Sequence, residues 1–280
     1  MENITKRQHY VPQFYLRKFI DENGELHCYN IKSNKLFRAH PKDVCFKDFG
    51  YETRSTSINR EILAPNEIEK MFRSLENEYS PVLTQIIRKC ELNYSGQGLI
   101  CTSSEKEILA SMISNFLARN FHAVDSFTNE EVARSLIDSN NEIGAIDALL
   151  REMKMGDVMP LIELAQKKIF LSPNENGVAQ SIIENLLKMN VSFFVSDSIR
   201  FVTSDCPVGY NCNSEEFFMV RMPLSPYVTV VYSNSEISKQ FRNRARLIEG
   251  RFVKKLNQDY MTWGIPNLII AKDKDDISTN

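Results

Sequence analysis

The sequence predicts an α+β fold in which a helical block packs on a mostly antiparallel sheet, with an N-terminal hairpin and a C-terminal meander. Apolar residues recur at helical spacing through much of residues 66–190. Runs of β-forming residues bounded by turn formers occupy residues 25–38 and 191–233. The composition, with 42% hydrophobic and 25% charged residues, is that of an ordinary globular protein. Disordered and fibrous classes are therefore excluded.

The first predicted elements are a short helix and a hairpin. Pro12 suits the first position of a helix, which the turn formers at residues 21–24 end. Strands at residues 25–30 and 35–38 follow, and the four residues between them read as a hairpin turn. Residues 39–65 are expected to form an irregular connection.

The middle of the chain is predicted to be helical. Asn66 followed by Glu69 resembles a capping box, and the helix that begins there is expected to reach Glu91, with Pro81 kinking or dividing it. A second helix begins at Thr102, and its broad apolar stripe is typical of a central helix. Further helical stretches are predicted at residues 129–155, 158–170 and 176–190.

The last third of the chain returns to β-structure. Residues 236–263 are predicted to form one long helix, followed by a strand at residues 267–271. Residues 1–272 are expected to form a single domain, and residues 273–280 a frayed tail. The strands expected to form the antiparallel meander are residues 191–196, 199–203, 217–222 and 227–233.

The bulk properties exclude several classes of function. A net charge of −2 argues against nucleic-acid binding over the whole surface. The sequence has no apolar leader and no run of 18 apolar residues, which predicts a cytoplasmic protein with no membrane span. Phosphate-binding loops, dinucleotide fingerprints and common hydrolase motifs are not found. No C-x-x-C pair or zinc spacing occurs, which indicates reduced thiols at Cys28, Cys45, Cys90, Cys101, Cys206 and Cys212.

Residues 8–19, QHYVPQFYLRKF, resemble the opening of a bacterial family known as a domain of unknown function, whose members begin H-Y-V-P-Q-F-Y-L-R-x-F. Residues 201–208, FVTSDCPV, are similar to the family's F-x-T-S-D-N-P-V, and residues 223–226 to its P-L-S-P. The resemblance spans nearly the whole chain and implies a bacterial source and a common fold, with no established activity. The chain departs from the pattern at Cys206, where relatives have asparagine, and at residues 120–121, where they have Thr-Pro.

Polar residues at the ends of the predicted elements suggest a catalytic site. His9 precedes the first helix, Glu76 lies at the edge of an apolar stripe, and Asp205 ends a strand. Such a mixed set of oxygen and nitrogen donors is used by Mg²⁺ or Mn²⁺ hydrolases. We therefore predict that Glu76 and Asp205 hold Mg²⁺ or Mn²⁺, with His9 as general base or further ligand.

Substrate contacts are predicted from the cationic and amide side chains. Gln13, Arg17 and Arg119 would contact a phosphate. Residues 239–255 carry seven Lys or Arg residues against one acid. As an amphipathic helix with a basic face that includes Arg242 and Arg246, this segment would bind nucleic acid along its phosphate backbone.

Each of these residues also has a structural interpretation. His9 can hydrogen-bond the body of the protein, Asp205 can cap its own loop, and Arg119 can pair with Glu76 or Asp205. Cys206 has no neighbouring base in the sequence, which argues against a nucleophilic role.

Two hypotheses follow. The first is a metal-dependent phosphodiesterase or nuclease that acts in bacterial defence against phage. The second is a non-catalytic binding, sensor or partner module of a defence or mobile-element system, with a protein as its partner. A metal site requires His9, Glu76 and Asp205 to lie within about 10 Å of one another.

Overall fold

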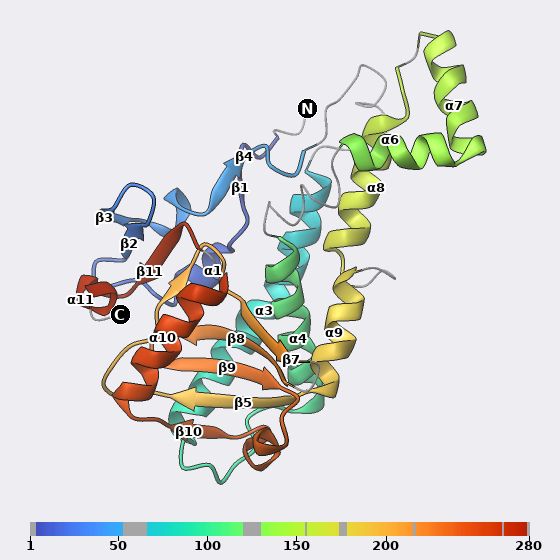
Figure 1. Ribbon diagram of the computed structural model, residues 1–280. Helices are drawn as coiled ribbons and strands as arrows, with labels where there is room; N and C mark the ends of the chain where they lie inside the picture. Colours follow the sequence, from blue (N-terminus) through green and yellow to red (C-terminus); the bar gives the residue numbers. More distant parts are fainter. Residues whose placement is uncertain are drawn as a thin grey trace.

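The computed structural model describes residues 4–52, 66–119, 130–154, 156–173, 178–214, 217–264 and 266–278. Long helices stand beside sheets that are antiparallel except at one edge, so the predicted α+β fold is confirmed (Figure 1). The departure from the family pattern at residues 120–121 lies outside the described residues, as do residues 53–65 of the expected irregular connection.

The N-terminal segment forms the predicted hairpin and one unpredicted strand pair. The hairpin turns through Asn34, whose φ of 52° lies in the left-handed region. The unpredicted pair is β1 with β4, and it joins His9 to Phe46 in antiparallel register. The elements are β1 (Arg7–His9), α1 (Gln13–Leu16), β2 (Leu26–Asn30), β3 (Lys35–Ala39), the 3-10 helix η1 (Pro41–Asp43) and β4 (Phe46–Asp48).

The helical block begins with α3 (Glu67–Leu92), which continues through Pro81 without being divided. Asn66 does not cap this helix; it has a φ of 63°, and its side chain accepts a hydrogen bond from Thr5 N at 2.6 Å. At the start of the second helix, the predicted cap at Thr102 is present as a capping box. The remaining helices of the block are α4 (Ser103–Ala118), α6 (Glu130–Ser139), α7 (Asn141–Glu152), α8 (Met159–Leu171) and α9 (Val178–Lys188).

Two larger sheets complete the fold. In the five-stranded sheet, of order β10-β5-β9-β8-β7, β5, β9 and β8 pair antiparallel as predicted. The unpredicted strand β7 pairs antiparallel with β8, and β10 runs parallel to β5. The strand expected at residues 199–203 is shorter and joins the other sheet, of order β3-β2-β11-β6. The bounds are β5 (Asn190–Val195), β6 (Thr203–Ser204), β7 (Gly209–Ser214), β8 (Phe217–Ser225), β9 (Val228–Ser233), β10 (Ala245–Leu247) and β11 (Leu268–Ala271).

The long helix predicted for residues 236–263 is wrong. The segment instead forms the 3-10 helix η2 (Glu236–Phe241), then β10, then α10 (Gly250–Gly264). Asn243 ends the first part with a φ of 55°, and its side chain exchanges hydrogen bonds with the backbone of Cys101. The backbone of β10 then forms its hydrogen bonds with β5 and not within a helix, a pairing that the apolar periodicity of the sequence did not indicate.

The basic face predicted on that helix is therefore lost. Arg242 follows η2, whereas Arg246 lies in β10 with its guanidinium 4.2 Å from the ring centroid of Phe241. The two arginines belong to different elements, so residues 239–255 do not form one continuous basic helix.

The C-terminal tail is also more ordered than expected. Residues predicted to fray include helix α11 (Lys274–Ser278), in which Asp276 is buried and lies 3.2 Å from Arg200 Nη1. Within the described part of the chain, no helix has the length and apolar character needed to cross a membrane.

The packing separates a large core from a projecting arm. The main core lies where α3 and α4 meet the five-stranded sheet, while α10 passes in front of that sheet in Figure 1. Helices α6 and α7, with the start of α8, extend away from the body (Figure 1). They enclose a separate small cluster of Ala133, Ile137, Val158 and Met159.

Candidate functional site

A cavity of about 540 Å³ opens where β1, α1 and η1 meet the first turns of α3 and the end of α4. Because α3 and α4 run antiparallel as neighbours, the start of one lies beside the end of the other. The cavity, called here the N-terminal pocket, contains five of the residues predicted from the sequence. Its lining is Thr5, Arg7, His9, Gln13, Phe14, Arg17, Lys42, Glu69, Glu76 and Arg119.

Arg119 and Glu76 form an ion pair in one wall of this pocket, as one interpretation of the sequence predicted. Arg119 Nη1 lies 2.8 Å from Glu76 Oε1, and the guanidinium carbon lies 3.6 Å from the ring centroid of Phe72. Arg119 is 2% exposed, and its carbonyl accepts a hydrogen bond from the Tyr51 hydroxyl. Its Nε atom is buried and has no hydrogen-bond partner, so this nitrogen is available to a ligand.

Glu69 lies two turns before Glu76 on α3 and faces the same pocket. Burial raises the pKa of its carboxyl group to about 7, with Glu76 acting in the same direction and Arg119 against it. Its Oε1 atom is buried and unpartnered. Glu69 was not among the site residues predicted from the sequence, although its seven-residue spacing from Glu76 places both on one face of a helix.

His9 faces the pocket from the end of β1. Burial lowers the pKa of its imidazole from the ordinary value of 6.5, although the backbone carbonyl groups of Lys42 and Pro41 favour the protonated form. Its Nε2 atom is buried without a hydrogen-bond partner. The imidazole is therefore neutral at pH 7, when Glu69 is close to half-protonated.

Cations surround the mouth of the pocket. Arg17 is exposed and donates to Gln13 Oε1 at 3.2 Å, so the predicted pair is together. Arg7 and Lys42 add two positive charges that sequence reasoning missed. Arg7 lies two residues before His9, which puts both side chains on one side of β1, and this alternation was the available signal.

Asp205 does not line the N-terminal pocket. Its Oδ1 atom accepts backbone hydrogen bonds from Asn267 at 3.1 Å and Leu268 at 3.2 Å, which ties the end of β6 to β11. His9 is influenced by the charge of Glu76, whereas Tyr10 is influenced by that of Asp205. Asp205 is therefore separated from the other two predicted catalytic residues, since both of those line the N-terminal pocket and Asp205 does not.

The residues chosen as metal ligands consequently do not share one site. Glu76 is paired with Arg119, and Asp205 is bonded to the backbone before β11. In the residues that the structure describes, no group of three or more His, Cys, Asp or Glu side chains is placed to hold a metal ion.

The family model for a protein of unknown function, DUF4238, matches residues 7–275. The chain belongs to the DUF4238 family. This confirms the resemblance to a domain of unknown function that the sequence suggested. No curated protein and no solved structure matches the chain. The site in this DUF4238 chain is therefore derived from its geometry.

The basic segment lies far from the N-terminal pocket. Leu247 N donates to Tyr94 O, just beyond the end of α3, and Arg242 lines a separate cavity beside the start of α4. Glu76 and Leu92 are separated by about 24 Å along α3. Arg242 and Arg246 therefore cannot contact the same phosphate as Arg119.

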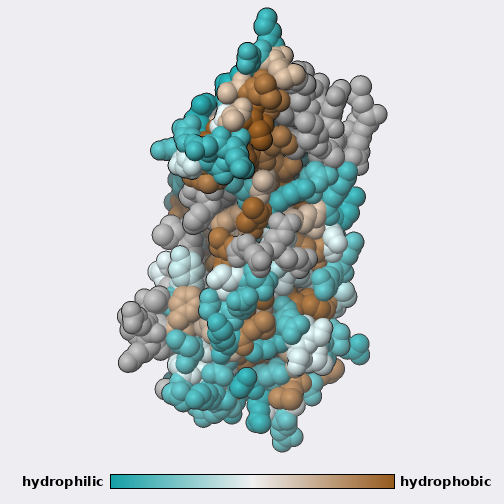
Figure 2. Space-filling model, turned by 90° about the vertical axis from the view of Figure 1, so that its right-hand side faces the viewer, coloured by the Kyte–Doolittle hydropathy of each residue, from teal (hydrophilic) through white to brown (hydrophobic). Residues whose placement is uncertain are grey.

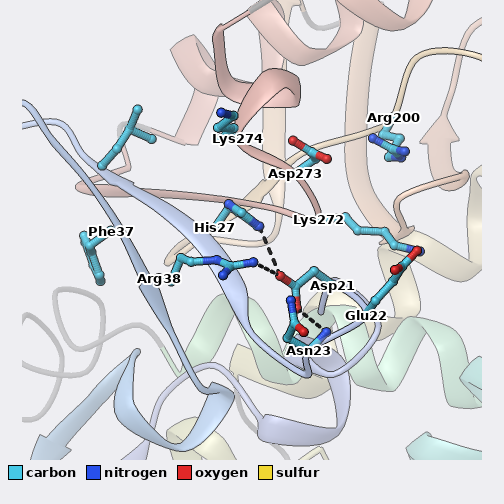
Figure 3. Close-up of a pocket in the computed structure, with 11 residues that line it drawn as sticks. Asp21, Glu22, Asn23, His27, Phe37, Arg38, Arg200, Lys272, Asp273 and Lys274 are labelled. Carbon is cyan, nitrogen blue, oxygen red and sulfur yellow. Dashed lines mark hydrogen bonds and ion pairs between the residues drawn. The ribbon is translucent and has the colours of Figure 1, made fainter.

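A second cavity, of about 630 Å³, is lined mainly by charged and polar side chains, and the interactions among them centre on Asp21 (Figure 3). Asp21 accepts hydrogen bonds from the Asn23 amide and from Arg38, and it lies 3.3 Å from His27 Nε2. None of the side chains lining this cavity has a buried polar atom without a partner. The N-terminal pocket of the DUF4238 chain differs in this respect, which makes it the stronger candidate site.

Proposed function

We propose that the N-terminal pocket is the active site of a phosphodiester-cleaving enzyme, a phosphodiesterase or nuclease. One observation carries the proposal: His9 Nε2, Glu69 Oε1 and Arg119 Nε are buried, unpartnered and gathered in one cavity. Buried polar atoms in proteins almost always have partners, so such a cluster is what a bound substrate would satisfy.

The environments of His9 and Glu69 suit general acid–base catalysis. Neutral His9 accepts the proton of the attacking hydroxyl group as its oxygen bonds to phosphorus. Protonated Glu69 donates its proton to the oxygen that leaves as the P–O bond breaks. Groups with pKa values close to the working pH are the most effective in these roles. The environment of Glu69 raises its pKa toward that range, and the environment of His9 keeps its imidazole neutral and able to accept a proton.

The cations supply the remaining requirement of the reaction. Arg119 Nε would contact a phosphate oxygen, and charge-assisted bonds of this kind stabilise charge that develops in the transition state. Glu76 acts as a positioning residue because its ion pair holds the Arg119 guanidinium. Arg7, Arg17 and Lys42 favour an anionic substrate over a neutral one.

The experiment measures cleavage of RNA, single-stranded DNA, plasmid and bis(p-nitrophenyl) phosphate by the purified protein. Each substrate is tested with Mg²⁺, with Mn²⁺ and with EDTA, which also tests the metal requirement expected from the sequence. The variants are His9→Asn and Glu69→Gln. The matched control is Glu78→Gln, since Glu78 is exposed on α3 and does not line the pocket.

We expect the wild type and the control to cleave at least one substrate. Each pocket variant should lose about 10²-fold or more in kcat/KM, the usual contribution of one acid or base. Equal cleavage by all four proteins would identify a contaminating nuclease. No cleavage of any substrate contradicts the proposal.

The ion pair itself favours a second candidate, a non-catalytic binding, sensor or protein-partner module. The ion pair of Arg119 and Glu76 joins α4 to α3, and the Arg119 guanidinium stacks on Phe72. This arrangement stabilises a fold without requiring turnover. Calorimetric titration of the wild type with a non-hydrolysable phosphodiester distinguishes the two: binding without cleavage of the matching substrate supports the second candidate.

The role in defence against phage is a proposal that follows from either candidate. It is tested by the efficiency of plating of a phage panel on bacteria that express the wild type or the Glu69→Gln variant. Equal plating on wild-type, variant and empty-vector cells contradicts it.

A further inference from the structure

Helix α7 carries an apolar stripe that nothing in the described part of the chain covers. Ile146, Leu149 and Met153 follow one another at spacings of three and four residues, and each is more than half exposed. None of the α7 side chains is fully buried. Figure 2 views the molecule from the side on which the arm projects, and it shows hydrophobic surface at the upper end of that face.

The opposite face of α7 buries little apolar surface, so packing on the arm stabilises this helix only weakly. Ile143 and Leu150 are only partly buried, against the small cluster of the arm. An isolated helix of this length is marginal in water, because its nucleation is costly and most helical stability in proteins comes from packing. A stripe of exposed aliphatic side chains on such a helix is typical of an interaction surface.

We propose that α7 pairs antiparallel with α7 of a second copy of this chain, across a two-fold axis. The alternation of three- and four-residue spacings is the pattern by which two helices interlock. A two-fold axis between positions 146 and 149 places Ile146 of each copy opposite Leu149 of the other. The same surface then contacts itself, as closed dimers require.

The charges at the two ends of α7 favour a second copy over an unrelated partner. Glu142 lies in the first turn of the helix, and Lys154 lies just after its end; both are exposed. In the antiparallel pair, Glu142 of each copy lies beside the end of the other helix, where Arg151, Glu152 and Lys154 together carry one net positive charge. The ion pair between Asp147 and Arg151, at 2.7 Å, is on another side of the helix and leaves the stripe uncharged.

The test is the mass of the full chain, measured by light scattering and sedimentation from about 1 to 100 µM protein. The variants are Leu149→Glu, Glu142→Lys and the double variant Glu142→Lys with Lys154→Glu. The matched control is Leu92→Glu, because Leu92 is also an exposed leucine but lies at the end of α3, outside the arm. Circular dichroism reports whether each variant is folded.

We expect the wild type and the control to reach twice the 32.3 kDa mass of the chain. Leu149→Glu should be a folded monomer throughout. Glu142→Lys should raise the dissociation constant about tenfold, because two attractive pairs become repulsive, and the double variant should restore it. A monomeric wild type, a dimer that survives Leu149→Glu, or a double variant as weak as the single one would overturn the proposal.

Discussion

Arg119 Nη1 lies 2.8 Å from Glu76 Oε1, with the guanidinium of Arg119 stacked on the ring of Phe72. The contact joins the end of α4 to the first half of α3, and it forms a wall of the N-terminal pocket. Arg119 is almost fully buried, whereas the Glu76 side chain is 29% exposed. The buried guanidinium therefore depends on the ion pair for its stabilisation more than the carboxylate does, because water reaches only the carboxylate.

Replacing Glu76 should destabilise the protein more than replacing Arg119. Glu76→Gln leaves a buried guanidinium without its partner, and we expect a loss of about 2–4 kcal/mol in the free energy of unfolding. Arg119→Met leaves a carboxylate that water reaches, so a loss of about 1–2 kcal/mol is expected. Urea unfolding measures both. The double variant should lose less than the sum of the two, and additive losses would show that the pair does not couple α3 to α4.

Catalysis by His9 and Glu69 predicts a bell-shaped pH profile of kcat/KM. Activity should rise as His9 loses its proton, at a pH below 6.5, and fall as Glu69 loses its own, at about pH 7. The optimum is then below pH 7, between the lowered pKa of His9 and the raised pKa of Glu69. In Glu69→Gln the alkaline limb should disappear from the residual activity, and a limb that persists unchanged would remove Glu69 from the role of acid.

Glu69→Gln should also change how stability depends on pH. The pKa of Glu69 is raised from 4.5 to about 7 in the folded protein, so the unfolded chain ionises first as the pH rises. The stability that this group contributes is present below pH 4.5 and is lost as the pH rises to about 7. Across this range we expect the free energy of unfolding of the variant to rise relative to that of the wild type, by on the order of 1 kcal/mol for a half-buried group. Melting temperatures from pH 4 to 8 measure the difference, and a constant offset contradicts the prediction.

Asp205 should affect stability and leave catalysis intact. Asp205→Ala removes the acceptor of two backbone hydrogen bonds at the start of β11, and a loss of about 1–3 kcal/mol is expected. Asp205→Asn keeps one carbonyl oxygen and should lose less. Unfolding and kcat/KM are measured for both variants at a temperature where each is folded. If the folded Asp205→Asn variant loses turnover, Asp205 has a catalytic role and the prediction is wrong.

Local signals predicted a substantial part of the fold and of the site. The capping box at Thr102 and the hairpin before Ala39 depend on contacts within a few residues, and both are present. The N-terminal pocket brings together five predicted site residues: His9, Gln13, Arg17, Glu76 and Arg119. Glu69 was not among the predicted site residues, because its shifted pKa arises from burial, which the sequence does not display.

Two expectations failed where a distant segment supplied the hydrogen bonds. Apolar periodicity favoured one helix over residues 236–263, but Asn243 bonds to Cys101, which is 142 residues away in the sequence, and β10 pairs with β5. The separation of Asp205 from Glu76 has a related cause. His9 ends β1 and lines the pocket that contains Glu76, whereas Tyr10, just after the strand, lies within range of the charge of Asp205.

The sequence by itself determined the class of fold, the family and the polar residues available for chemistry, because helix periodicity, turn formers and motifs are local properties of the chain. Only the tertiary structure decided which of those residues meet. Burial, unpartnered polar atoms and shifted pKa values result from packing between segments far apart in sequence. The N-terminal pocket and the exposed stripe of α7 are both properties of that packing.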